Sequence, residues 1–195
     1  MKVLYFTNPE VNDAYLIPSI IESNGDKVTV VTSKPTLELV ETNSIEMIIC
    51  DRARALITQD ILDHLPKAVI NIHPSFLPYN RGYYPNFWSH RTQTPSGCTI
   101  HYVDQGIDTG EIISQTLICF SQNDTLRTSY ETLRKLSVNL FSMIYPRIRS
   151  KNINSVAQPE IAASKTYYKK DFDGIHQKLP QGWDTPISDI PFLQL

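Results

Sequence analysis

Residues 67–90, KAVINIHPSFLPYNRGYYPNFWSH, join a short apolar run to a long irregular segment. Residues 67–72 are nearly continuous in apolar side chains, which is the pattern of a parallel strand covered by helices on both faces. The segment after Pro74 is rich in aromatic, amide and guanidinium groups, yet it follows neither helical nor strand periodicity. Loops of this kind often carry function, so we expect a ligand site where the strand ends.

The same alternation of short apolar runs and helix-length segments extends along most of the chain. We expect strands over residues 2–6, 27–32, 46–50, 67–72, 98–104 and 111–119, and helices over 12–24, 58–65 and 124–148. The last helix is expected to begin behind an Asn-Asp cap. The pattern predicts an α/β fold with an open, mostly parallel, twisted sheet of Rossmann-like type. One domain over residues 1–160 and a short C-terminal extension over 161–195 are expected.

Composition narrows the class of protein. The 195 residues are 41% apolar and 19% charged, as in soluble globular proteins, and no apolar run is long enough to cross a bilayer. The N-terminus resembles a first strand more than a signal peptide, so a cytoplasmic location is expected. The net charge of −2 offers no basic face for duplex nucleic acid. Three scattered cysteines without C-x-x-C spacing predict reduced, buried thiols.

Common nucleotide-binding loops are missing from the sequence. The stretch after the first strand, TNPEVNDAY at 7–15, has no glycine, and no Walker A motif occurs in the chain. In open parallel sheets ligands gather at the carboxyl ends of the strands. The end of strand 67–72 is therefore the expected site.

Three side chains at this edge have complementary chemistry. Asn71 and His73 are two residues apart on an extended segment, so they point to the same side, and Asp108 lies in a loop that can fold back over them. An imidazole can accept a proton, a carboxylate can orient it, and an amide can stabilise an oxyanion. An Asn-x-His pair also occurs by chance, and a histidine at a strand end is usually only hydrogen-bonded. No Ser, Cys or Lys on the strand is an obvious nucleophile, which favours direct attack by a substrate.

Two sequence blocks carry a family resemblance. AVINIHPSFLP at 68–78, followed by GCTIHYVDQGIDTGEIISQ at 97–115, resembles the 10-formyltetrahydrofolate-dependent formyltransferase family. With the preceding β/α pattern, the resemblance covers about residues 1–150 and implies that residues 1–160 are a formyltransferase catalytic domain. It also implies that Asn71 and His73 are the catalytic amide and imidazole, that Asp108 is the matching carboxylate, and that His101 supports them.

The resemblance also implies a formyl donor, 10-formyltetrahydrofolate. RARALITQDIL at 52–62 is similar to the family segment that borders the folate pocket, although Thr58 stands where the family usually has proline. A plain connection between strand and helix is the other interpretation of this segment. The folate contacts so implied are Arg54, Ala55, Leu56, Asp104 and Gly106.

The acceptor is indicated by shorter similarities. PYNRGYYPNFWS at 78–89, TYYKKDF at 166–172 and LPQGWDTP at 179–186 resemble sugar-nucleotide N-formyltransferases. This implies a 4-amino-4,6-dideoxyhexose linked to a nucleotide, dTDP above all, in surface-polysaccharide (O-antigen, lipopolysaccharide) synthesis. The predicted substrate contacts are Ser75, Asn80, Arg81, Tyr84 and Asn86, whereas Phe87 and Trp88 are expected to pack in the core.

Other functions remain open at this stage. Glycinamide ribonucleotide or a GDP-linked perosamine-type sugar could be the acceptor, whereas methionyl-tRNA is disfavoured because the tail is too short for an RNA-binding domain. A non-catalytic folate or sugar-nucleotide binder is a remoter alternative.

No metal is expected, because His73, His90 and His101 lack the spacing of a zinc site. We further expect a homodimer formed through apolar residues of the extension, namely Trp183, Ile187, Ile190, Phe192 and Leu193.

Overall fold

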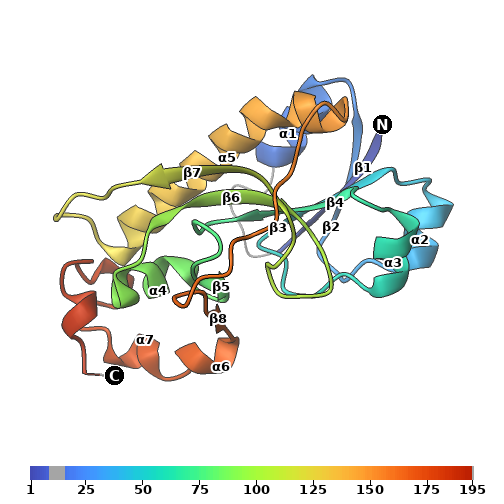
Figure 1. The fold of residues 1–195 in the computed structure, drawn as a ribbon. Helices are drawn as coiled ribbons and strands as arrows, with labels where there is room; N and C mark the ends of the chain where they lie inside the picture. Colours follow the sequence, from blue (N-terminus) through green and yellow to red (C-terminus); the bar gives the residue numbers. More distant parts are fainter. Residues whose placement is uncertain (9–15, 195) are drawn as a thin grey trace.

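The computed structural model describes residues 1–8 and 16–194, and a six-stranded sheet lies at its centre (Figure 1). The strand order is β2-β1-β3-β4-β6-β7. The first four strands in this order pair in parallel, whereas β6 pairs antiparallel with β4 and with β7. The prediction of an open, mostly parallel sheet is confirmed. The strands are β1 (Lys2–Thr7), β2 (Lys27–Val31), β3 (Met47–Asp51), β4 (Val69–His73), β6 (Ser96–Tyr102) and β7 (Ile112–Ile118).

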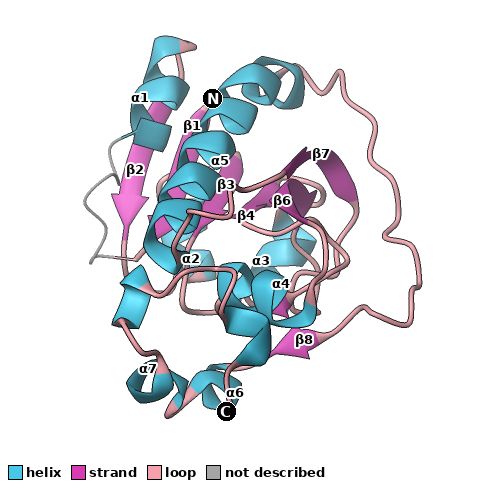
Figure 2. Ribbon diagram, turned by 90° about the vertical axis from the view of Figure 1, so that its left-hand side faces the viewer, coloured by secondary structure: helices cyan, strands magenta, loops and turns pink. Residues whose placement is uncertain are grey.

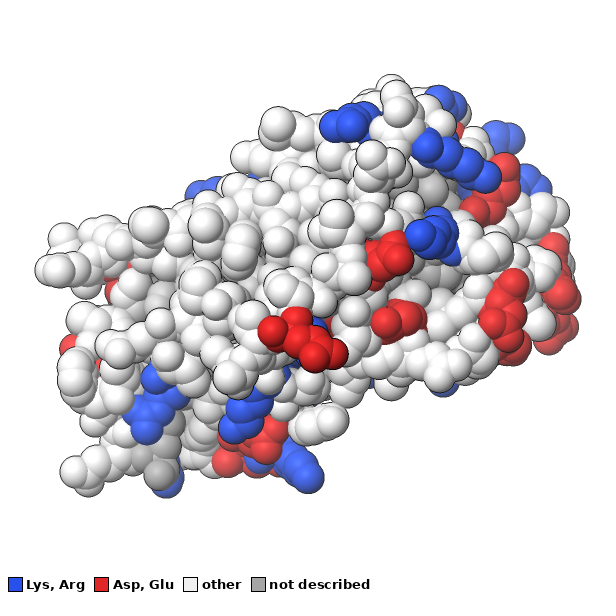
Figure 3. All heavy atoms as spheres, in the orientation of Figure 1, with Lys and Arg blue, Asp and Glu red and all other residues white. Residues whose placement is uncertain are grey.

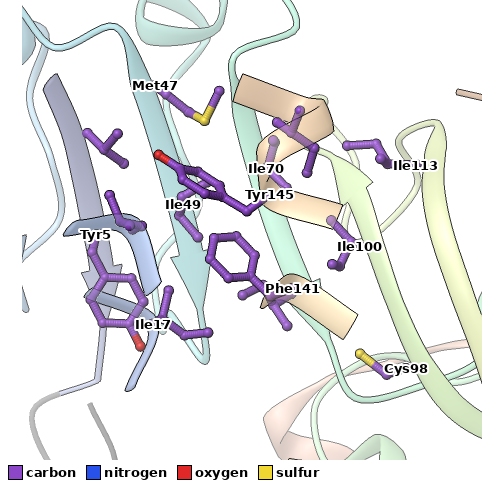
Figure 4. Packing of buried hydrophobic residues seen from close by; sticks show 14 residues of the cluster. Tyr5, Ile17, Met47, Ile49, Ile70, Cys98, Ile100, Ile113, Phe141 and Tyr145 are labelled. Carbon is purple, nitrogen blue, oxygen red and sulfur yellow. The ribbon is translucent and has the colours of Figure 1, made fainter. Parts of the chain in front are cut away.

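Helices cover both faces of the sheet. On one face α1 (Leu16–Ser23) and α5 (Leu126–Arg149) bury side chains such as Ile17, Phe141 and Tyr145 against the strands (Figure 4). On the other face α2 (Leu37–Thr42) and α3 (Gln59–His64) complete a second apolar cluster. Because successive strand residues face opposite sides, strands buried on both faces need the continuous apolar runs seen in the sequence.

Element boundaries differ slightly from the expected ones. The strand expected over 67–72 begins at Val69 and extends to His73. The cap of α5 is Thr125, not the preceding Asn-Asp pair, because the Thr125 hydroxyl accepts a hydrogen bond from the Thr128 amide. Helix α2 was not predicted. Of the helix expected over 12–24, residues 12–15 lie outside the described residues.

The irregular segment after β4 is held by the C-terminal part of the chain. Its short strand β5 (Arg81–Gly82) pairs in parallel with β8 (Thr166–Tyr167), and helix α4 (Pro85–Thr92) follows. Figure 2 shows that β8 is reached by a long connection from the end of α5. Segments far apart in sequence therefore build the edge of the sheet where β4 ends.

The C-terminal extension packs on its own chain. It contains α6 (Lys169–Phe172), α7 (Ile175–Lys178) and two 3-10 turns, η1 (Gly182–Asp184) and η2 (Ile190–Phe192). Its apolar residues share a cluster with the core of the molecule: Phe87, Leu126, Phe172, Ile175, Leu179 and Ile190, with Trp88, Trp183, Ile187 and Leu193 packed against it. The core role predicted for Phe87 and Trp88 is confirmed.

This packing changes the argument for a dimer. Of the five residues expected at a dimer interface, Ile190 is buried and Trp183, Ile187 and Leu193 are partly buried within the chain, whereas Phe192 is 81% exposed. Their apolar character is mostly explained without a second copy, and the homodimer stays a prediction.

Several surface features bear on the expectations from composition. Cys50 and Cys98 are buried free thiols, but Cys119 is exposed, so the prediction of three buried cysteines was wrong for one of them. On the face shown in Figure 3, basic and acidic side chains are scattered and mixed. Within residues 1–8 and 16–194, no helix is both long and apolar enough to pass through a lipid bilayer.

Replacement of Ile190 by alanine tests whether the extension belongs to the core. Ile190 is fully buried, so Ile190→Ala should lower the free energy of unfolding by about 2–4 kcal/mol through lost burial and a residual cavity. Phe192→Ala, two residues away at an exposed position, is the control and should change it by less than about 0.5 kcal/mol. Urea unfolding measures both. Equal, small effects would mean that the extension does not contribute to the cooperative core.

Candidate active site

The site begins with two residues of β4 at the point where the sheet changes from parallel to antiparallel pairing. Asn71 and His73 lie on the same side of the strand, and His73 is its last residue. Across the antiparallel ladder with β4, His101 of β6 is paired with Asn71. On the other side of β6, the register with β7 shifts between Ile100 and His101. Directly opposite residues have neighbouring side chains, so the Asn71 Nδ2 atom lies 3.2 Å from Nε2 of His101.

Asp108 completes the cluster from the connection between β6 and β7. Its Oδ1 accepts a hydrogen bond from Asn71 Nδ2 at 2.9 Å, and its Oδ2 accepts one from the backbone amide of Gly82 at 2.8 Å. The same carboxylate lies 3.5 Å from Nδ1 of His73 and 3.4 Å from Nε2 of His101. The predicted convergence of Asn71, His73 and Asp108 is therefore present, and His101 lies with them.

The connection approaches the sheet closely because of a glycine. A Cβ atom at Gly110 would lie 1.9 Å from the Tyr102 carbonyl oxygen, which no other residue could tolerate without movement of the backbone. Asp108 itself has a φ of 54°, in the left-handed region that most residues avoid. Contacts around Asp108 must stabilise this conformation.

His73 is only 5% exposed. Oxygen atoms face both of its ring nitrogens. Nδ1 faces the Asp108 carboxylate, and Nε2 lies 3.2 Å from the backbone carbonyl oxygen of Asn80. A neutral imidazole carries one N–H and can donate to one of these acceptors, whereas an imidazolium donates to both. The surroundings therefore complement the protonated ring.

Burial opposes this preference. It lowers the pKa of His73 below its ordinary value, and the Asp108 carboxylate offsets only part of that effect. Burial alone would raise the pKa of Asp108, but the two histidine rings and the Gly82 amide outweigh it and hold that pKa well below its usual range. At neutral pH the cluster thus combines an ionised carboxylate with a neutral imidazole that can take up a proton.

His101 orients the amide of Asn71. Its Nδ1 lies 2.7 Å from the Tyr102 carbonyl oxygen, an arrangement that requires a proton on Nδ1. Its Nε2 lies 3.2 Å from Nδ2 of Asn71 and can accept from that amide when Nε2 carries no proton. Asp108 and His101 together fix the plane of the Asn71 carboxamide.

The residues expected to border folate lie on two neighbouring segments. Residues 52–58 connect β3 to α3, and Leu56 is an apolar side chain with 58% of its surface exposed. Gln59, at the start of α3, accepts a hydrogen bond from Gln105 at 2.6 Å, which joins this segment to the loop that carries Asp108. The carboxylate of Asp104 accepts from the Gly106 amide and shapes that loop. Arg54 and Ala55 lie on the first segment.

Three of the five predicted substrate contacts lie inside the protein. The Ser75 hydroxyl donates to the Tyr79 carbonyl, the Asn80 amide to the Thr94 hydroxyl, and the Asn86 amide to α5 at Leu126 and Ser129. All three side chains are at most 7% exposed. Their hydrogen bonds stabilise the loop and α4, and contact of these side chains with a substrate stays a prediction.

Arg81 and Tyr84, the other two, remain near the surface. Arg81 is partly buried and donates from Nε and Nη2 to Gln158. Tyr84 is 39% exposed, and its ring stacks on Phe172 of the extension with centroids 4.0 Å apart.

Two contributors to the site were not predicted. The Gly82 amide and the Gln158 side chain, which donates to the Asp108 carbonyl oxygen at 2.8 Å, both contact Asp108. Gln158 belongs to an irregular segment far along the chain from the other members, and no local pattern marks it.

A second concave region lies away from this cluster. A hollow of about 520 Å³ is bordered by α4, the ends of β6 and β7 and the C-terminal segment. Its titratable side chain is His90, which lies edge-on to Phe120, and burial lowers the pKa of His90 to about 4 against the opposing effect of Asp124. The cluster in which Asp108 contacts Asn71, His73 and His101 is the better candidate for catalysis.

Comparison with known proteins places the cluster in a family context. Residues 20–144 match the family described as formyl transferase. The formyltransferase PseJ from Anoxybacillus kamchatkensis is 36% identical, with a TM-score of 0.89 over 97% of both chains. Its structure is a complex with UDP-4,6-dideoxy-4-formamido-L-AltNAc and tetrahydrofolate.

More distant structures share the fold. A sugar N-formyltransferase from Shewanella sp FDAARGOS_354 is 18% identical, with a TM-score of 0.76 over 98% of this chain and 86% of that one. Phosphoribosylglycinamide formyltransferase from Bacillus halodurans is 22% identical, with a TM-score of 0.69 over 78% of this chain and 97% of that one.

Replacement of Asp108 by asparagine tests the electrostatic link to His73. The Asp108 carboxylate raises the pKa of His73, so Asp108→Asn should lower that pKa further. Nuclear magnetic resonance titration of the His73 ring measures the change. Asp173→Asn, an exposed position on the extension, is the matched control and should leave the His73 titration where it is. An unchanged or higher pKa of His73 in Asp108→Asn would contradict the proposed contact.

Proposed function

This chain belongs to the formyl transferase family, and from that premise we propose that it transfers the formyl group of 10-formyltetrahydrofolate to the amino group of a nucleotide-linked 4-amino-4,6-dideoxy sugar. The observation that carries the proposal is the contact of Asp108 with Asn71 and His73 at the end of β4. Support for the substrates comes from PseJ, 36% identical, whose complex contains tetrahydrofolate and a UDP-linked 4-formamido-4,6-dideoxy sugar.

In the proposed reaction the sugar amino nitrogen attacks the formyl carbon, and the bond from that carbon to N10 of the folate breaks. His73 accepts the proton that the amine loses and returns it to N10, so protons balance over the cycle. Neutral His73 can act in this way because burial keeps its pKa below its ordinary value. Once protonated, the ring donates from Nδ1 to Asp108 and from Nε2 to the Asn80 carbonyl, which stabilises the cation.

Asn71 is proposed to stabilise the oxygen of the formyl group as it gains negative charge. One Nδ2 hydrogen is held by Asp108, which orients the carboxamide, and the other, which faces His101 in the substrate-free site, is the one proposed to turn to the formyl oxygen. A preoriented donor of this kind contributes about 3 kcal/mol in comparable oxyanion sites. No side-chain nucleophile is needed, and the mechanism has no covalent enzyme intermediate.

The folate is proposed to lie along residues 54–56 and the loop that carries Asp104 and Gly106. Both segments are irregular, so their backbone amide and carbonyl groups are not all used within regular structure and can meet the polar edges of a pterin. Leu56 offers exposed apolar surface on the first of these segments.

The sugar nucleotide is proposed to approach from β5 and the extension. Nε and Nη2 of Arg81 donate to Gln158, so its Nη1 atom is proposed to meet a diphosphate, and the partly exposed ring of Tyr84 is proposed for stacking. The ammonium group of Lys165 lies over the ring of Tyr167, 4.8 Å from its centroid, on the strand paired with β5. Positive charge and aromatic surface therefore meet beside the catalytic cluster.

The nucleotide is proposed to be UDP. The sequence favoured dTDP, but the relative that shares 36% identity over almost its whole length was solved with a UDP sugar. The phosphoribosylglycinamide enzyme, at 22% identity, indicates a common fold only, so glycinamide ribonucleotide enters as a comparison substrate.

An acceptor assay tests the proposed function directly. With 10-formyltetrahydrofolate as donor, we expect tetrahydrofolate release with a UDP-linked 4-amino-4,6-dideoxy sugar, and slower release with the dTDP- and GDP-linked amino sugars. Mass spectrometry should find the acceptor heavier by one formyl group. Release with glycinamide ribonucleotide alone would overturn the sugar proposal, and release with no amine would overturn the transferase proposal as a whole.

Substitution of His73 separates chemistry from binding. His73→Ala should lower kcat by about 100- to 10,000-fold, because proton transfer belongs to the transition state, while sugar-nucleotide affinity stays within about threefold. Rates of tetrahydrofolate release give kcat, and titration calorimetry gives the affinity for the sugar nucleotide. His64→Ala, at a half-exposed position on α3, is the control for the loss of an imidazole. A parallel loss of affinity and rate in His73→Ala would assign the residue to binding instead.

A further inference from the structure

Gln158 lies on the long connection between α5 and β8. This connection, residues 150–165, runs from the end of α5 past β7 to β8 (Figures 1 and 2). It is fixed to β7 by two backbone hydrogen bonds between Val156 and Ile112, of 2.8 and 2.9 Å. Gln158 is two residues further on and partly buried, whereas its neighbours at 156, 157, 159 and 160 are exposed.

The Gln158 side chain uses its full hydrogen-bonding capacity. Its Nε2 donates to the Asp108 carbonyl oxygen at 2.8 Å and to the Gly110 carbonyl oxygen at 2.9 Å. Its Oε1 accepts from Arg81 Nε at 3.1 Å and from Arg81 Nη2 at 2.7 Å. A single carboxamide therefore joins the Asp108 loop, the β5 segment and the connection to the extension.

These bonds matter because the conformation of Asp108 is costly. A residue other than glycine with φ near 54° is held against about 1–3 kcal/mol of local strain. The carboxylate side of Asp108 is held by Asn71 and Gly82, and the peptide side is held by Gln158. Loss of the peptide anchor would let the carboxylate shift relative to His73, already 3.5 Å away.

We propose that Gln158 is a positioning residue for formyl transfer: it fixes the Asp108 peptide so that the carboxylate faces His73, and it ties this geometry to Arg81. The proposal rests on the proposed function, because it assigns Gln158 to the same site. Gln158 itself touches no reacting atom, and its effect passes through Asp108.

The hydrogen bonds of Gln158 to the Asp108 loop and those from Arg81 can be separated by substitution. Methionine has a similar length and removes both sets of hydrogen bonds. Glutamate keeps an acceptor for Arg81 but places an oxygen against the carbonyl oxygens of Asp108 and Gly110. It therefore removes only the hydrogen bonds to the Asp108 loop. Gln122→Glu, in an exposed turn outside the site, is the control for the change of charge.

Steady-state kinetics and their pH dependence test the proposal. We expect Gln158→Met and Gln158→Glu each to lower kcat by about 10- to 100-fold, because small displacements of catalytic groups have effects of this size. The KM for the sugar nucleotide should stay within about threefold in Gln158→Glu, which keeps an acceptor for Arg81, and should rise in Gln158→Met. The acid limb of its pH profile should move to lower pH, because a displaced carboxylate raises the His73 pKa less. Gln122→Glu should behave as the unmodified protein.

Titration of the His73 ring in substrate-free protein makes the outcome independent of the reaction. A lower His73 pKa in Gln158→Met supports the positioning role even if the unmodified chain transfers no formyl group, in which case the proposed function alone fails. An unchanged His73 titration, or a kcat within twofold of the unmodified protein, overturns the positioning role. If Gln158→Met does not fold, a Gln158→Glu protein with unaltered kcat overturns it equally.

Discussion

The whole site depends on one carboxylate that is bound from two sides. Asp108 accepts from the Asn71 side chain on β4 and from the Gly82 amide on β5, and it faces His73. A buried carboxylate is stable only when such donors replace water. Burial makes the ionised Asp108 carboxylate costly, and the same burial lowers the pKa of His73, so that His73 is neutral. The site therefore holds a charged carboxylate beside a base that can accept a proton.

The fold explains why these groups meet at this place. Strand β4 is parallel to β3 and antiparallel to β6, so its carboxyl end adjoins the open edge of the parallel sheet and the loop leaving β6. Parallel strands put functional groups at their carboxyl ends, and the antiparallel partner brings His101 directly opposite Asn71. The register shift next to His101 is the kind of irregularity that re-aims a side chain.

The sequence predicts those parts of the molecule that follow local periodicity. The sheet, α5 and the same-side placement of Asn71 and His73 come from patterns of two and of 3.6 residues. Family resemblance assigned a role to Asp108, already a candidate, and added His101. The structure shows Ser75, Asn80 and Asn86 tying loops and α4 together, a role that polarity alone does not distinguish from the binding of a substrate. Gln158 could not be found, since its partners are set by a contact 50 residues away in sequence.

The C-terminal extension is better described as a wall of the site than as an appendage. Strand β8 holds β5 through hydrogen bonds such as that from the Arg81 amide to the Lys165 carbonyl, and Phe172 stacks on Tyr84. The Gly82 amide that binds Asp108 is therefore placed by residues beyond 160. A division of the chain at that position separates β5, whose Gly82 amide binds the carboxylate, from β8, which holds β5 in place. The extension thus contributes to the stability of the core and to the geometry of the site. Changes in its packing should alter, through β5, the position of the Asp108 carboxylate relative to His73.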